Sequence, residues 1–317
     1  MAIQNRLTRH LGIEHPVLLA PMDLVSGGRL AAAVSQAGGL GLIGRGYGDD
    51  AWLEREWPRA GNARIGCGFI TWSLAERPVL LDAALAHRPA AVMLSFGDPR
   101  PFADAIHAAE AKLICQVQTL AQASEAKEAG ADVIVAQGTE AGGHGMTAPL
   151  ITLLPQAADL CPDIPIVAAG GIADGRGLAA ALMLGAEGVM MGTRFYASEE
   201  AEGHPEAKLR IVAAQSGQTL RSIVFDLSRN KRWPSGFTGR VLRNAHAEKW
   251  LGREGELEAR AEEVGRDYAA ACESGDFDIA AVIAGEACAL IHDIPSAREI
   301  VWRIVARAER AMAPQRP

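Results

Sequence analysis

Short apolar runs alternate with Ala-rich amphipathic stretches along the first two thirds of the chain. The apolar runs cover residues 16–21, 40–44, 65–70, 91–96, 112–117, 132–137, 164–169 and 188–192. Continuous apolar runs of this length, each followed by a Gly or Pro break, are typical of buried parallel strands. Eight strand–helix units predict an α/β fold, a closed (β/α)8 (TIM) barrel, rather than an open doubly wound sheet. The G-x-G-x-G run at 44–48 does not change this, because it lacks the dinucleotide-binding pattern.

Capping residues mark where several helices begin. Thr119 stands three residues before Gln122, which is the spacing of a capping box. Asp174 is placed to cap a helix that ends near 185, and Ser296 with Glu299 marks the start of the last helix.

The alternating pattern stops after the eighth expected strand. A final helix is expected over 204–215, and residues 216–252 are irregular before helical character returns. We therefore predict a barrel over 1–215, a small appended substrate or lid domain over 216–270, and C-terminal helices over 271–317 that pack on the barrel.

The composition fits a soluble enzyme. Of the 317 residues, 49% are hydrophobic and 22% charged, and the net charge of −7 argues against a nucleic-acid or anionic-membrane surface. The basic cluster at 229–232 is predicted to be a solvated face. No segment resembles a signal peptide or spans a bilayer. The five cysteines are widely spaced without a C-x-x-C pair, so we expect neither disulfides nor a metal site. We expect a cytoplasmic location.

Glycines follow the seventh and eighth expected strands, where TIM barrels commonly hold phosphate. The two strand ends read AAGGI at 168–172 and MMGTR at 190–194. Exposed backbone N–H groups in such turns form an anion-binding nest. The candidate residues are Gly170, Gly171, Met191, Gly192 and Thr193. This signal indicates phosphate but leaves FMN, a sugar phosphate and a nucleotide open.

Other strand ends carry residues suited to a flat ligand. The candidates are Ala20, Pro21, Met22, Gly68, Gln116 and Gln137. A glycine there makes room for a planar ring, and a glutamine amide can both donate to and accept from ring edges. The alternative for Pro21 is an ordinary proline that ends a strand.

His144 is the strongest candidate for chemistry. It lies in the run AQGTEAGGHG at 136–145, directly after the sixth expected strand. The other seven histidines fall in helices or connecting segments. A histidine in a glycine-rich loop at a strand end can face a ligand and act as a general base near neutral pH.

The segment QGTEAGGHG closely resembles the signature of the nitronate monooxygenase family, once called 2-nitropropane dioxygenases. SFGDPRP at 95–101, AAGGIADGRG at 168–177, GTRFYASEEA at 192–201 and the segment at 233–244 are similar to family motifs as well. Many members have Asn where this chain has Gly68.

The resemblance implies FMN as cofactor, contacted by the strand-end residues above together with Ala141, Gly142 and Gly143. It also implies oxidation of alkyl nitronates, and possibly nitroalkanes, by O2 to a carbonyl compound and nitrite. His144 would then deprotonate a neutral nitroalkane or position the nitronate.

Two other functions remain open on the same scaffold. One is an NAD(P)H-dependent FMN reductase of a quinone or enoyl thioester, and the other is a non-catalytic binder of FMN or another phosphometabolite. Trp233, Phe237 and Trp250 either wall the pocket or form the core of the small domain, and we expect the core. The physiological substrate is not determined by the sequence, and a homo-oligomer is left open.

Overall fold

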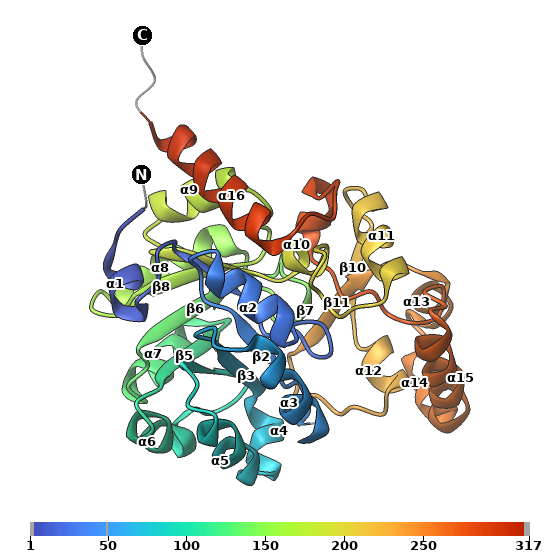
Figure 1. Ribbon diagram of the computed structural model, residues 1–317. Helices are drawn as coiled ribbons and strands as arrows, with labels where there is room; N and C mark the ends of the chain where they lie inside the picture. Colours follow the sequence, from blue (N-terminus) through green and yellow to red (C-terminus); the bar gives the residue numbers. More distant parts are fainter. Residues whose placement is uncertain (1–2, 49, 314–317) are drawn as a thin grey trace.

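The eight expected strands form one parallel barrel (Figure 1). The computed structural model describes residues 3–48 and 50–313. The barrel strands are β1 (Val17–Leu19), β2 (Leu42–Gly44), β3 (Gly66–Ile70), β4 (Ala91–Ser95), β5 (Lys112–Val117), β6 (Val133–Gln137), β8 (Ile166–Ala169) and β9 (Gly188–Met191). Their order around the sheet is β1-β9-β8-β6-β5-β4-β3-β2. A parallel bridge between Leu18 and Leu40 joins the two ends, so the predicted TIM barrel is confirmed.

Helices cover the outside of the barrel. They are α2 (Gly28–Gln36), α3 (Asp50–Glu56), η1 (Pro58–Ala60), α4 (Thr71–Glu76), α5 (Val79–Ala86), α6 (Arg100–Ala108), α7 (Leu120–Glu128), α8 (Leu150–Leu160), α9 (Gly175–Met183) and α16 (Ala297–Met312). The predicted caps are present, because Thr119, Asp174 and Ser296 accept hydrogen bonds from the first turns of α7, α9 and α16.

The last helix of the barrel comes from the end of the chain. After β9 the chain forms α10 (Thr193–Tyr196) and α11 (Pro205–Ala213), and α11 packs into a separate apolar cluster away from the barrel core. It is α16 that packs between α9 and α2, burying Ile300, Val301 and Ile304 in the barrel core. Residues 204–215 are therefore helical as expected, but they do not complete the barrel.

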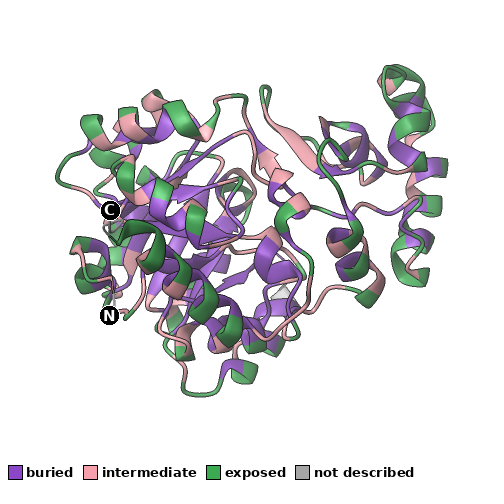
Figure 2. Cartoon of the chain, turned by 90° about the horizontal axis from the view of Figure 1, so that it is seen from above, coloured by how far each residue is buried: buried purple, intermediate pink, exposed green. Residues whose placement is uncertain are grey.

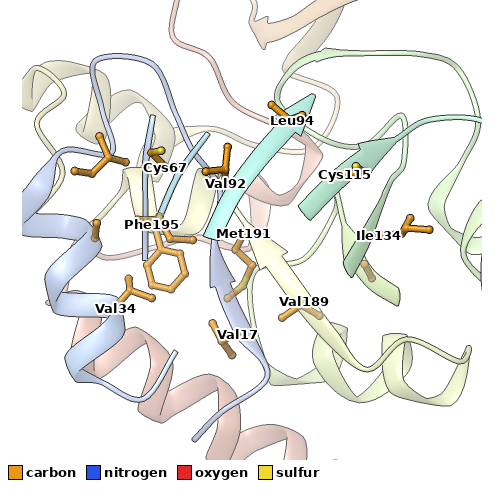
Figure 3. Close-up of a cluster of buried hydrophobic side chains, with 14 of the residues drawn as sticks. Val17, Val34, Cys67, Val92, Leu94, Cys115, Ile134, Val189, Met191 and Phe195 are labelled. Atoms are coloured by element: carbon orange, nitrogen blue, oxygen red, sulfur yellow. The ribbon is translucent and has the colours of Figure 1, made fainter. Parts of the chain in front are cut away.

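The core has two layers, one on each face of the barrel strands. Side chains such as Leu18, Met93 and Ile114 fill the interior, and Leu7 and Leu11 of α1 (Arg6–Leu11) belong to the same buried cluster. The alternate side chains of the same strands face the surrounding helices, as Figure 3 shows. In Figure 2 the barrel strands are buried, and the exposed residues lie on the helices and in the connecting loops. This alternation follows from the period of two along each strand.

A second, three-stranded antiparallel sheet lies beside the barrel. Its strands are β7 (Gly143–Gly145), β10 (Thr219–Ser222) and β11 (Thr238–Leu242), in the order β10-β11-β7. The helices α12 (Val224–Ser228), α13 (Ala245–Trp250), α14 (Glu254–Ala259) and α15 (Ala261–Ser274) gather on the same side in Figure 1, and η2 (Glu286–Leu290) follows them in the chain. The division into three units at 215 and 270 remains a prediction.

The loop expected to carry His144 is thus partly a strand. Gly143, His144 and Gly145 pair with Arg240, Gly239 and Thr238 of β11. A Gly-His-Gly sequence has no apolar alternation that could predict a strand, so its extended form depends on hydrogen bonds from a distant segment. Across the described part of the chain, none of the helices has the length and apolar character to cross a bilayer.

Candidate active site

A cavity of about 480 Å³ opens at the carboxyl ends of the barrel strands. Every residue predicted for the site lines it: Ala20, Pro21, Met22, Gly68, Gln116, Gln137, Ala141, Gly142, Gly143, His144, Gly170, Gly171, Met191, Gly192 and Thr193. These residues come from positions 20 to 193 of the chain, and they meet because parallel strands present their carboxyl ends at one edge. The structure brings the predicted residues together, and their individual roles remain predictions.

His144 faces a buried carboxylate that sequence reasoning did not identify. Its Nε2 lies 2.9 Å from Oδ2 and 3.0 Å from Oδ1 of Asp226, a residue of α12 that is only 4% exposed. Burial lowers the pKa of His144 below the usual value, against the opposing effect of the Asp226 carboxylate. The imidazole is therefore neutral at neutral pH, which is the form a base requires.

Arg229 belongs to this pair rather than to a solvated face. Its Nη2 donates to Oδ1 of Asp226 at 2.8 Å, its Nε donates to the Phe225 carbonyl, and its side chain is 24% exposed. The residue also lines the cavity. The prediction of a solvated cluster over 229–232 is therefore wrong for Arg229, because Asp226 lies one helical turn before it and draws the guanidinium inward.

Aromatic side chains cover the histidine. The rings of Trp233 and His144 stack with centroids 3.4 Å apart and planes 7° from parallel. Phe96 contacts both rings edge-on, and the indole N–H of Trp233 donates to the Tyr47 hydroxyl at 2.9 Å. Trp233 therefore lines the cavity, contrary to the expectation that it lies in a core. Trp250 is in a core as expected, 1% exposed among the apolar side chains of α12, α14 and α15.

Hydrogen bonds from three side chains hold the glycine-rich segment before His144. Gln137 Nε2 donates to the His144 carbonyl at 3.1 Å, while its Oε1 accepts from Gln116. Arg221 and Arg240, from β10 and β11, both donate to the Thr139 carbonyl. Burial lowers the pKa of Arg221 to about 10, which leaves it charged at neutral pH. The segment is therefore fixed by the barrel on one side and by the second sheet on the other.

The backbone of the glycine-rich segment is in close contact with the backbone around Gly285. A Cβ added at Gly142 would lie 2.6 Å from the Gly285 nitrogen, and one at Gly285 would lie 2.5 Å from the Glu140 carbonyl oxygen. The Gly285 N–H also donates to the Thr193 hydroxyl at 2.9 Å. Thr193 therefore connects the end of β9 to the segment before η2.

The ends of β8 and β9 have the form expected for a phosphate site. Gly170 and Gly171 have φ of 108° and 72°, a left-handed conformation that favours glycine. Gly192 has an ordinary φ of −102°, and a Cβ there would approach nothing closer than 3.4 Å. Protein packing therefore does not require glycine at 192, whereas a group held against this backbone would fill the space of a Cβ.

Gly68 lines the cavity and also makes room for a neighbouring side chain. A Cβ at this position would lie 2.4 Å from Cγ of Pro21. Glycine at this position of β3 therefore accommodates the proline. The space at position 68 therefore depends on Pro21 as well as on the absence of a side chain at Gly68.

Asp226, Arg229, Arg221 and Tyr47 are the contributors that sequence reasoning missed. Asp226 stands 82 residues from His144, in a short amphipathic segment without a motif. The cluster at 229–232 was a signal, but an isolated basic run is typical of a solvated surface.

The fold and the cavity define a TIM-barrel enzyme with its active site at the strand ends. The sequence profile described as nitronate monooxygenase matches residues 4–56 and 73–307. The chain belongs to the nitronate monooxygenase family, and it is an oxidoreductase of the kind that acts on nitronates.

Individual relatives and solved structures are similar to this chain over most of its length. A nitronate monooxygenase of Neurospora crassa is 32% identical over 91% of this chain and 88% of its own. Among solved structures, FabK from Thermotoga maritima superposes with a TM-score of 0.86 at 33% identity, covering 97% of both chains. A nitroalkane oxidase from Streptomyces ansochromogenes superposes with a TM-score of 0.80 at 26% identity, covering 98% of this chain and all of that one (100%).

Proposed function

We propose that this enzyme binds FMN non-covalently in the cavity and oxidises alkyl nitronates with O2 to a carbonyl compound and nitrite. Neutral nitroalkanes would enter the same reaction after deprotonation. The observation that carries the proposal is the placement of His144, which lines the cavity beside β6 with Asp226 at its Nε2.

The strand ends support FMN rather than a dinucleotide. Glycines at 170, 171 and 192 leave backbone accessible where a single phosphate would lie, and the chain has no pattern for a second nucleotide. Met22, Gln116 and Gln137 line the same cavity and would contact the ring system. FMN, when bound, supplies the electron-transfer chemistry, and the protein supplies orientation and electrostatics.

His144 would take the proton from the carbon that bears the nitro group. The electron pair left on that carbon delocalises into the nitro group, which gives the anionic nitronate. The stacked Trp233 and the edge of Phe96 exclude water from the face of the imidazole. A preformed nitronate has already lost this proton, so it depends less on His144 as a base.

The cofactor is tested on the purified protein. Denaturation should release a flavin that chromatographs as FMN in about equimolar amount. Release of FAD, or a protein that is colourless and takes up no FMN, would contradict the cofactor assignment.

The substrate class is tested by anaerobic mixing. A nitronate should bleach the flavin absorbance rapidly, and admission of O2 should restore it with formation of nitrite. NADH should act slowly or not at all, because the sequence has no pattern for a nicotinamide nucleotide. Rapid bleaching by NADH with an inert nitronate would instead support the reductase alternative. The predicted cytoplasmic location and any homo-oligomer remain predictions.

A further inference from the structure

The carboxylate of Asp226 determines which nitrogen of His144 carries a proton. An ionised carboxylate only accepts hydrogen bonds, and both of its oxygens lie within 3.0 Å of Nε2. The guanidinium of Arg229, a permanent donor, binds Oδ1 at 2.8 Å and stabilises the ionised acceptor. Nε2 therefore donates, and the lone pair of the neutral ring is on Nδ1.

The second ring nitrogen is left for a ligand. Nδ1 of His144 has no hydrogen-bond partner among residues 3–48 and 50–313, while the residue lines the cavity. The ring itself has little freedom to turn. Its backbone is paired with β11, its carbonyl is held by Gln137, and one face is covered by Trp233.

We propose that Asp226 is a positioning residue for His144, which holds the proton on Nε2 so that Nδ1 is the atom that receives the substrate proton. The inference rests on the proposed function only for the identity of the proton donor. After the transfer both nitrogens carry protons, and the carboxylate stabilises the positive charge of the imidazolium. A buried carboxylate fixes the tautomer of a catalytic histidine and stabilises its imidazolium in the same way in Ser-His-Asp enzymes.

The variant Asp226→Asn tests this with little change in shape. Arg229 would hold the amide oxygen, so the amide NH2 would occupy the place of Oδ2, 2.9 Å from Nε2. An NH2 group can only donate, so it favours the tautomer that accepts at Nε2 and carries the proton on Nδ1, over one that donates to an amide oxygen already bound by Arg229. The variant should lose about 10²–10⁴ in kcat/KM for a neutral nitroalkane. It should lose much less with the preformed nitronate.

The protonation site is also measurable without turnover. NMR of isotope-labelled histidine should find Nε2 protonated in the wild type and in Asp226→Glu, and Nδ1 protonated in Asp226→Asn. Asp226→Glu should also recover part of the nitroalkane activity. Asp278→Asn is the matched control, because Asp278 pairs with Arg210 on an exposed face away from the cavity, and it should behave as the wild type.

The possible outcomes separate this inference from the proposed function. A wild-type His144 with its proton on Nδ1 would overturn it, and this measurement needs no variant to fold. Equal losses on nitroalkane and nitronate in Asp226→Asn, with the proton still on Nε2, would reduce Asp226 to a structural residue. If no nitronate is oxidised at all, the proposed function fails while the NMR result still decides the role of Asp226.

Discussion

Replacing Gly142 by alanine tests whether the contact behind the glycine-rich segment positions the active site. The added Cβ would lie 2.6 Å from the Gly285 nitrogen and 2.7 Å from the Ala284 carbonyl carbon. Carbon atoms in ordinary contact stand about 3.5–4.0 Å apart, so the two segments must separate by about 1 Å. Both partners are backbone atoms and cannot turn aside as a side chain would.

The expected cost follows from this displacement. Overpacking of this kind destabilises proteins by about 1–3 kcal/mol. At about 2 °C per kcal/mol for a chain of this size, Tm should fall by about 2–6 °C. His144 stands two residues away on the same segment, and a misplacement of about 1 Å at a reacting group costs about 10² in rate. The loss of activity should therefore exceed what the loss of stability explains.

Thermal unfolding and steady-state nitrite formation measure the two effects on one preparation. Gly255→Ala is the control, because its Cβ would meet nothing within 4 Å, and alanine in a helix should raise stability by about 0.4–1 kcal/mol. Wild-type Tm and kcat/KM in Gly142→Ala would refute the reasoning, since the segments would then separate at no cost.

Three further substitutions probe other parts of the site and core. His144→Asn should lower kcat/KM for neutral nitroalkane by about 10²–10⁴, with a smaller loss on nitronate. Because burial lowers the pKa of His144, the wild-type rate should fall on acidification only below about pH 6.5. Unchanged kinetics in the variant, or a decline that starts well above that pH, would count against His144 as the base. Gly192→Ala should lower the flavin-to-protein ratio while the flavin-free protein keeps its Tm, because the Cβ meets no protein atom closer than 3.4 Å; full flavin occupancy would remove 192 from the phosphate site. Trp250→Ala, at a position 1% exposed, should lower the free energy of unfolding by about 3–5 kcal/mol in denaturant titration, and a loss under 1 kcal/mol would contradict its place in a core.

The barrel was predictable because its signal is local. Each strand is buried on both faces, which requires a continuous apolar run, and some helices begin at a residue such as Thr119 or Asp174 whose side chain caps them. The cluster of site residues followed from the same regularity, because glycines and polar residues at the carboxyl ends of parallel strands must lie at one edge.

Pairings between distant segments could not be predicted from the sequence. The Gly-His-Gly strand exists only because β11 pairs with it, and Asp226 reaches His144 only because the fold brings α12 next to β7. Likewise α16, and not 204–215, completes the barrel, since its apolar stripe matches the groove between α9 and α2.

The sequence by itself determined the barrel, the edge where the predicted site residues gather and the histidine proposed to act there, because these depend on periodicity and on strand ends. Only the tertiary structure decided how that histidine is held. Its carboxylate, its stacked indole and the arginine beyond them come from one segment whose contacts depend on chain folding rather than on any pattern within the segment.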